Sequence, residues 1–477
     1  VYKRQIKIEN NSNDSEQTEE EFLDISKDGT EEEYVEEMEE VTPEFEDSSA
    51  VTVTTYADTS IDVSTFEAFK QAVDKTSTYG IINIRAGFTA TSNVSIYGTR
   101  TINMNGFTIN MQEFYITNMF EDNGCVLAFI GGTITGSISG TAGNRGIIHS
   151  SSRTSTIKLL NMNVLATSKG AALYSEYGSR KLDSSSFDRF YISNSIISNT
   201  GGGTTIYAAG SQIFNVRITN SSEIHCNGYD YAVGEVGQQQ IHHPYAVFST
   251  YANIIIENGS KAINEHDAWG AFVVKSYYGD ITIDSTSRIE NKNIYERGIA
   301  LVPGKGKINI AGYVSGIGTS TKGYRMPDTI SLEITGTVNN LALSPSSCSN
   351  YDIVVRENGY LMFSPMHTQG YFHLKIADSA VVDISNNTAQ CISSYTETNI
   401  EITGGTINRI VSFNNFETGY APTTFTMTGG TINGGIRAGG SASKTTIDIS
   451  GGKIISNSLN LSQSHMSPIH ILSLIHI

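Results

Sequence analysis

Three stretches near the end of the chain are almost identical: ITGGTIN (402–408), MTGGTIN (427–433) and ISGGKII (449–455). They recur about every two dozen residues. A period of this size is typical of one coil of a β-solenoid, because two or three short strands with their turns use about that many residues. The repeat therefore predicts a chain whose coils stack on one another along one axis.

Within each copy, apolar and polar residues alternate as they do in a strand with one buried face. We expect Ile402 and Ile407 to point into the core and Thr403 and Thr406 to point outward. The two glycines between them would form the corner of the coil. Glycine suits a corner because it adopts left-handed backbone angles without strain.

The same strand, turn, strand pattern extends upstream to residue 80, and equivalent positions can be aligned through it. Asn408 and Asn433 are equivalent in successive copies, which predicts a side-chain ladder. Small turn residues align at steps of 20 to 27 residues: Gly259, Ser285, Gly312, Gly336, Gly359, Ser379, Gly404, Gly429 and Gly451. The fold predicted for residues 51–461 is all-β, a right-handed parallel β-helix. A sandwich of antiparallel hairpins is the alternative, since it also alternates strands and turns.

One segment has a different period. In STFEAFKQAVDKTS (64–77), Phe66, Phe69 and Val73 recur at helical intervals, and Ser64 and Glu67 have the spacing of a capping box. We expect a helix over 64–77 that covers the open end of the first coil, where apolar core and strand edges would otherwise face water.

The net charge of −17 is concentrated at the start of the chain. Residues 1–47 contain 4 Lys/Arg and 18 Asp/Glu, whereas the remaining residues contain 27 and 30. Such an acidic stretch repels itself and has little apolar surface, so residues 1–50 are predicted to be a disordered spacer. A partner-binding acidic segment is the other interpretation. The nearly neutral remainder argues against a nucleic-acid-binding surface, which needs clustered Lys and Arg.

The two ends differ from the rest of the sequence. The opening VYKRQ (1–5) and the closing HILSLIHI (470–477) resemble translated adapter sequence, so 462–477 is expected to be a non-native or disordered tail and both natural ends to be missing. No segment has the roughly 20 apolar residues of a membrane span. Four widely spaced cysteines, Cys125, Cys226, Cys348 and Cys391, are expected to be buried single thiols.

Residues 64–112 carry a resemblance to a known family. A helix, then IINIRAGF (81–88), then NVSIYGTRTINMNGFTINM (93–111) resembles the N-terminal part of the pectate-lyase-like adhesive domain of Gram-positive surface proteins. The resemblance implies a pectin-lyase-like right-handed parallel β-helix on a secreted or cell-surface bacterial protein, in contact with glycans or host surfaces. It does not carry an activity, because this fold hosts lyases, hydrolases, tailspikes and adhesins.

The motifs of the enzymes that share this fold are missing. From 51 to 461 there is no Asp-Asp, Asp-x-Asp or Asn-Thr-Asp that would supply clustered carboxylates for calcium or for inverting hydrolysis. We therefore expect an adhesin-like, glycan-contacting module with no cofactor and no metal. A polysaccharide lyase or glycoside hydrolase is the alternative, and a trimeric phage tailspike or an ice-binding protein is a more distant one.

The enzyme alternative rests on residues 230–269. There Glu265, Asp267 and His266 are the candidate catalytic residues, as acid and base. The candidate ligand-binding residues are His242, His243, Tyr231 and Trp269. A metal site from His242, His266 and Asp267 is an alternative, and a solvent-facing loop between coils with no site is another. Elsewhere, the pair Tyr277–Tyr278 is predicted either to bind glycan or protein, or to cap coils.

Overall fold

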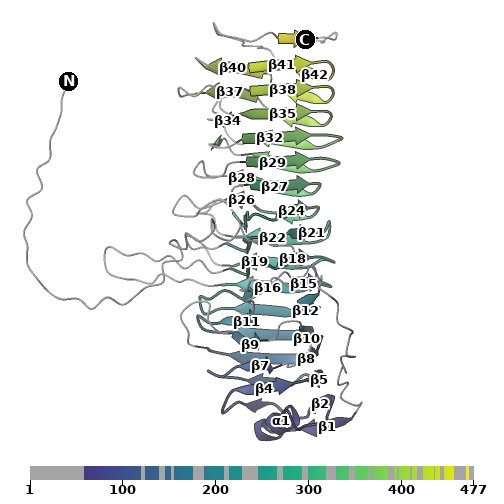
Figure 1. The fold of residues 1–477 in the computed structure, drawn as a ribbon, viewed down its shortest axis with the longest axis vertical. Coiled ribbons are helices and arrows are strands. Elements are labelled where there is room, and N and C mark those ends of the chain that lie inside the picture. Colours follow the sequence, from purple (N-terminus) through teal and green to yellow (C-terminus); the bar gives the residue numbers. More distant parts are fainter. Residues whose placement is uncertain are drawn as a thin grey trace, which may run out of the picture. The chain divides into compact units, whose positions relative to one another are not determined.

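The structure is a computed structural model, and it describes residues 59–119, 124–138, 146–151, 155–175, 187–208, 214–227, 245–265, 272–292, 299–318, 329–342, 350–363, 366–368, 371–384, 392–394, 397–408, 411–415, 423–434, 436–440, 445–455 and 469–471. They belong to one compact unit, Val53–Ile477. The fold is a right-handed parallel β-helix, with its strands stacked coil upon coil (Figure 1). The predicted spacer, residues 1–50, lies outside the described residues.

The strands form three columns, and each coil runs from the first column to the second and then to the third. The first column contains β1 (Ser60–Val63), β2 (Ile81–Ile84), β5 (Arg100–Asn103), β8 (Val126–Gly136), β10 (Thr156–Ala166), β12 (Asp188–Ser193), β15 (Asn215–Thr219), β18 (Asn253–Ile256), β21 (Ile281–Ile283), β24 (Lys307–Ile310), β27 (Thr329–Ile334), β29 (Asn350–Val355), β32 (Tyr371–Ile376), β35 (Thr398–Ile402), β38 (Thr423–Met427), β41 (Thr445–Ile449) and β43 (Ile469–Ile471).

The second column contains β3 (Phe88–Thr89), β6 (Thr108–Asn110), the ends of β8 and β10, β13 (Ile196–Asn199), β16 (Glu223–Cys226), β19 (Lys261–Asn264), β22 (Arg288–Asn291), β25 (Tyr313–Val314), β28 (Thr337–Ala342), β30 (Tyr360–Phe363), β33 (Val381–Ile384), β36 (Thr406–Asn408), β39 (Thr431–Asn433) and β42 (Lys453–Ile455). The third contains β4 (Val94–Tyr97), β7 (Ile116–Met119), β9 (Gly146–Ser150), β11 (Ala171–Ser175), β14 (Ile206–Ala208), β17 (Val247–Ser249), β20 (Val274–Ser276), β23 (Leu301–Val302), β26 (Ile317–Gly318) and the end of β28. A separate sheet contains β31 (Met366–Thr368), β34 (Ile392–Ser394), β37 (Val411–Asn415) and β40 (Ile436–Gly440).

Neighbouring strands in a column are equivalent strands of successive coils, and every pairing among the described strands is parallel. A sandwich of antiparallel hairpins is therefore excluded for this part of the chain. Strand β43 pairs with β41, so regular structure is present within the segment 462–477.

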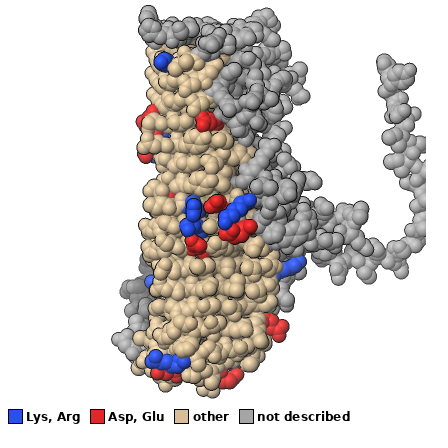
Figure 2. Space-filling view, turned by 180° about the vertical axis from the view of Figure 1, so that it is seen from behind, with Lys and Arg blue, Asp and Glu red and all other residues tan. Residues whose placement is uncertain are grey.

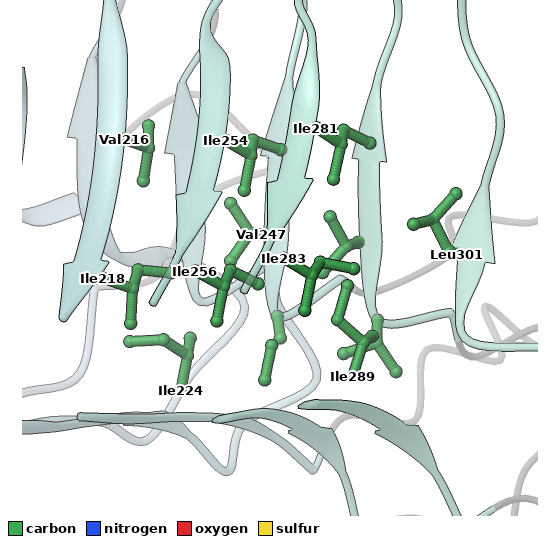
Figure 3. Packing of buried hydrophobic residues seen from close by; sticks show 14 of the residues in the cluster. Val216, Ile218, Ile224, Val247, Ile254, Ile256, Ile281, Ile283, Ile289 and Leu301 are labelled. Carbon is green, nitrogen blue, oxygen red and sulfur yellow. The ribbon is translucent and has the colours of Figure 1, made fainter. Parts of the chain in front are cut away.

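The core is a set of aliphatic rows that run along the stack. Val216, Ile254 and Ile281 are register partners on successive coils, and all are buried (Figure 3). In the repeat, Ile402 and Ile407 are buried as predicted, whereas Thr403 is exposed. Each added coil covers the apolar face of the one before, so the burial that stabilises the fold is spread evenly along the axis.

The register confirms most of the alignment of small turn residues. Gly312, Gly336 and Gly359 are equivalent to one another, and so are Ser379, Gly404, Gly429 and Gly451. The alignment was wrong by one position between Gly359 and Ser379 and at Gly259, and by two positions at Ser285. From β19 onward, the residue that precedes each strand of the second column is Ser260, Ser287, Gly312, Gly336, Gly359, Ala380, Gly405, Gly430 and Gly452. Its size is limited because the preceding coil lies directly against it: a Cβ atom on Gly336 would overlap the carbonyl oxygen of Gly312.

Two polar ladders join the coils at this corner. Ser222 donates its backbone N–H to the Ser260 hydroxyl at 3.2 Å, and Ser260 donates in the same way to Ser287 at 3.2 Å. On the outer surface, Asn433 donates its side-chain amide to Asn408 Oδ1 at 2.8 Å, which confirms the predicted asparagine ladder. Both ladders satisfy polar groups that stacking would otherwise leave without partners.

The cysteines fit the prediction where they are described. Cys125 and Cys226 are buried, while Cys348 and Cys391 lie outside the described residues. Cys226 donates its thiol to Asn264 Oδ1 at 3.6 Å. Burial raises the pKa of the Cys226 thiol to about 12, so the thiol stays protonated and acts as this donor.

The predicted helix is present but shorter than expected. Helix α1 spans Phe66–Ala72, and Thr65, not Ser64, is its N-cap and accepts from the Ala68 N–H at 3.3 Å. Phe66, Phe69 and Ala72 are buried against the first coils, at the N-terminal end of the stack (Figure 1). The helix ends early because the chain turns at Asp74, whose carbonyl accepts from the Ser77 N–H at 3.0 Å.

Candidate functional site

Only one of the predicted site residues is described. Glu265 directly follows β19, whereas Tyr231, His242, His243, His266, Asp267 and Trp269 lie outside the described residues. The catalytic and ligand-binding assignments around 230–269 therefore remain predictions.

Glu265 is part of an ionic network across three coils. Its Oε2 lies 2.7 Å from Lys292 Nζ, and its Oε1 lies 3.3 Å from His225 Nδ1. The other ring nitrogen of His225, Nε2, lies 3.1 Å from Glu223 Oε2. Two carboxylates on neighbouring coils thus face one imidazole from opposite sides.

Lysines neutralise both carboxylates of this network. Lys261 Nζ lies 2.6 Å from Glu223 Oε1, and its hydrogen bond lowers the pKa of Glu223 below the ordinary 4.5. A general acid needs the opposite change, a pKa raised toward the working pH. Glu223 is therefore suited to holding coils together and not to donating a proton.

A second cluster of the same kind lies on the first column, and no sequence motif marks it. His373 Nδ1 lies 2.9 Å from Asp352 Oδ1, and His373 Nε2 lies 3.6 Å from Glu401 Oε1. Lys375 Nζ lies 3.5 Å from Glu401 Oε2. The residues come from β29, β32 and β35, three successive coils, so only the register brings them together.

Aromatic side chains form a column on the outer side of the third column of strands. Tyr174, Tyr207 and Phe248 are register partners, and their rings stack with centroids 5.5 Å and 5.0 Å apart. Stacked rings on successive coils cover one another, which extends the packing of the core to the outside of the sheet. Lys275 is the register partner of Phe248 on the next coil, and the Tyr277 ring lies 5.7 Å from that of Phe248 and almost perpendicular to it.

A parallel column lies in the turn that follows the third strand of each coil. Tyr251 and Tyr278 stack with centroids 4.4 Å apart and planes at 10°, and Lys305 Nζ lies 5.2 Å from the Tyr278 centroid. These three residues come from successive coils, with Tyr251 on the coil before Tyr278 and Lys305 on the coil after it. Both faces of the Tyr278 ring are therefore covered, and its edge is what meets solvent.

Tyr277 is placed differently from Tyr278. Among the described residues, no ring stacks parallel to Tyr277, although 39% of the residue is exposed. Lys275 Nζ lies 4.0 Å from its centroid. Burial raises the pKa of the Tyr277 hydroxyl, so the side chain is neutral at physiological pH. The Tyr277–Tyr278 pair thus presents two partly exposed tyrosines, at 39% and 38%, side by side in sequence on one turn.

This turn is held rigidly by its neighbours. Tyr277 donates its N–H to the Ser249 carbonyl at 3.1 Å, and its own carbonyl accepts from the Lys305 N–H at 2.6 Å. Tyr278 donates to the Thr250 carbonyl at 2.9 Å. The tyrosines are thereby fixed before any ligand arrives, which lowers the entropy lost on binding.

In Figure 2, Lys, Arg, Asp and Glu gather in one group midway along the visible face and are sparse over the rest of it. Among the described residues, no three His, Cys, Asp or Glu side chains are grouped so as to hold a metal ion. No helix in the described part of the chain is long and apolar enough to cross a membrane.

Comparison with known proteins identifies no relative: no family model, no curated protein and no solved structure matches this chain.

Proposed function

We propose that this β-helix is an adhesin-like module that contacts glycans outside the cell, with Tyr277 as its central contact. The finer likeness, to the pectate-lyase-like adhesive domain of Gram-positive surface proteins, rests on the helix and first coils at residues 64–112. In this proposal the acidic residues 1–50 serve as a spacer that holds the β-helix away from the cell envelope.

The observation that carries the proposal is the exposed ring of Tyr277 on a turn fixed by hydrogen bonds to both adjacent coils. An aromatic ring presents a flat apolar surface to the C–H groups of a sugar. Rigid aromatic contacts of this kind dominate the binding energy of many interfaces.

A glycan array probed with the full chain tests this proposal. We expect binding to a subset of glycans, and we expect Tyr277→Ala to weaken it about tenfold or more, as loss of a central aromatic contact does. Phe107→Ala is the matched control, because Phe107 is similarly exposed, at 37%, but lies between β5 and β6, far along the stack from the candidate site. Binding that Tyr277→Ala leaves intact would contradict the proposal.

A polysaccharide lyase or glycoside hydrolase is a second candidate. The observation that favours it is the placement of Glu223 and Glu265 on neighbouring coils with His225 between them. The test compares Glu265→Ala and Asp267→Ala with the parent chain on a panel of polyuronides and neutral glycans. Activity in the parent that either substitution abolishes supports the enzyme, and no activity in any of the three rejects it.

A further inference from the structure

The described structure places a lysine amine next to each ring of the tyrosine pair. Lys305 Nζ lies 5.2 Å from the Tyr278 centroid, and Lys275 Nζ lies 4.0 Å from the Tyr277 centroid. Lys305 is exposed, whereas Lys275 is buried. Lys305 is thus the exposed ammonium group that a ligand at Tyr277 and at the edge of Tyr278 would meet.

We propose that Lys305 is the specificity-determining residue of this surface and selects glycans that carry carboxylate or sulfate groups. The inference rests on the proposed glycan contact. It deepens that proposal because the rings alone would accept neutral and charged sugars alike, whereas an ammonium group beside them favours a negatively charged one.

A backbone hydrogen bond fixes the position from which the Lys305 side chain extends. Its N–H donates to the Tyr277 carbonyl at 2.6 Å, which sets the start of the side chain one coil above the tyrosine pair. Its neighbour Lys307 is used differently, since Lys307 Nζ lies 3.0 Å from Glu333 Oε2. Lys305 Nζ lies instead near the Tyr278 ring, at 5.2 Å from its centroid.

Among the described residues, the acid nearest in sequence to the tyrosine pair is held in place by the turn. The carboxylate of Asp280, the acid closest in sequence to the tyrosine pair, accepts the Lys307 N–H at 2.7 Å and is held in the turn. The excess of acidic residues is confined to 1–47, and the remaining residues contain 27 Lys/Arg against 30 Asp/Glu. Long-range repulsion from the β-helix is therefore weak at physiological salt, where charges more than about 8 Å apart are largely screened.

Paired oligosaccharides of equal length test the inference on the full chain. One pair is a hyaluronan oligosaccharide and its carboxyl-reduced form, and the other is a chondroitin sulfate oligosaccharide and its desulfated form. We expect the parent chain to bind the charged member of at least one pair about fivefold more tightly, as one solvent-exposed ion pair allows. The two pairs distinguish a preference for carboxylate from one for sulfate.

Variants assign this preference to one residue. Lys305→Gln should bring the affinity ratio close to one, Lys305→Arg should keep it, and Lys453→Gln, at an exposed lysine of β42, should leave it unchanged. Added salt should reduce the ratio, because the Debye length falls from about 10 Å at 0.1 M to about 3 Å at 1 M.

The outcomes separate this inference from the proposed function. Equal affinity for both members of each pair, or a ratio that Lys305→Gln does not change, overturns the selectivity while glycan binding itself stands. Failure to bind any glycan, charged or neutral, overturns both.

Discussion

Asn408 and Asn433 lie on adjacent coils, and the Asn433 amide donates to Asn408 Oδ1 at 2.8 Å. Asn408 donates in turn to Asp383 on the coil before. The same arrangement occurs near the N-terminal end, where Asn103 donates to Asn83 at 2.9 Å and Asn83 donates to Asp62 at 3.1 Å. In each case a row of amides ends on a carboxylate, which accepts without needing to donate. Coil stacking in this protein is thus fixed by side chains as well as by the strand hydrogen bonds.

The N-terminal cap should depend on one buried arginine. Arg100 is fully buried and donates from Nη2 to the Ser77 carbonyl at 2.9 Å, in the segment that follows α1. We expect Arg100→Ala to lower the free energy of unfolding by about 2–4 kcal/mol, because it removes charged hydrogen bonds and side-chain packing together. Urea denaturation measures this change.

Arg85→Ala is the control for the cap. Arg85 pairs with Asp62 at 3.0 Å, but about half of each side chain is exposed. Loss of such a surface pair should change the free energy of unfolding by less than about 1 kcal/mol. Equal effects of the two substitutions would contradict the role assigned to Arg100.

The repeat predicts that substitutions on the buried face of its strand lower the free energy of unfolding much more than substitutions on the exposed face. Ile402→Ala should lower the free energy of unfolding by about 2–5 kcal/mol, because Ile402 is fully buried and its loss leaves a cavity between coils. Thr403→Ala, at the next and exposed position, should change it by less than about 0.5 kcal/mol. Thermal unfolding of both variants provides the comparison, and similar losses would mean that the register of the repeat is wrong.

Two glycines with nearly the same backbone angle should respond differently to substitution. Gly106 has φ of 81° and open space where a Cβ atom would be, whereas Gly430 has φ of 78° and a Cβ atom there would overlap the Gly404 carbonyl. Gly106→Ala should cost about 1–2 kcal/mol from the left-handed angle alone. Gly430→Ala should cost clearly more, measured by urea denaturation. Equal losses would show that the close approach of the coils is not what requires glycine at 430.

The stability of the fold should rise with pH above neutrality because of Lys275. Burial lowers the pKa of Lys275 to about 7 from the ordinary 10.5. Between these values the unfolded chain binds a proton that the folded chain does not, so the free energy of unfolding increases with pH. Below about pH 7 the lysine is protonated in both states, and the full free-energy cost of burying its charge lowers the stability of the fold.

Lys275→Met removes this contribution. The variant should be the more stable chain at about pH 6.5, and its advantage in Tm should shrink as the pH approaches about 9.5. Melting curves across this range test it, and parallel profiles of the two chains would contradict a neutral Lys275 in the fold.

Much of the fold followed from the sequence because a solenoid repeats its environment. Ile402, Ile407 and the Asn408–Asn433 ladder were predicted from spacing alone, since each coil presents the same contacts to the next. The errors arose where two residues adjacent in sequence could both fill the same structural position. Ser64 and Thr65 can both cap a helix, and Gly259 and Ser260 can both occupy a tight corner, so only the register separates them.

The candidate site was less predictable for a physical reason. The spacing between coils changes where segments are inserted: Ser222 and Ser260 are equivalent but 38 residues apart, whereas Ser260 and Ser287 are 27 apart. The contact of His225 with Glu265 crosses that insertion, so no fixed period reveals it. The column of Tyr251, Tyr278 and Lys305 does follow the 27-residue spacing. That period predicts that the three residues lie next to one another on successive coils.

The most direct test of the account is the affinity of Tyr277 variants for the best-bound glycan of the array, measured by calorimetry on the full chain. If the ring of Tyr277 is the central contact, Tyr277→Phe should bind within about twofold of the parent, and Tyr277→Ala should bind about tenfold or more weakly. Parent-like binding by Tyr277→Ala would contradict the account.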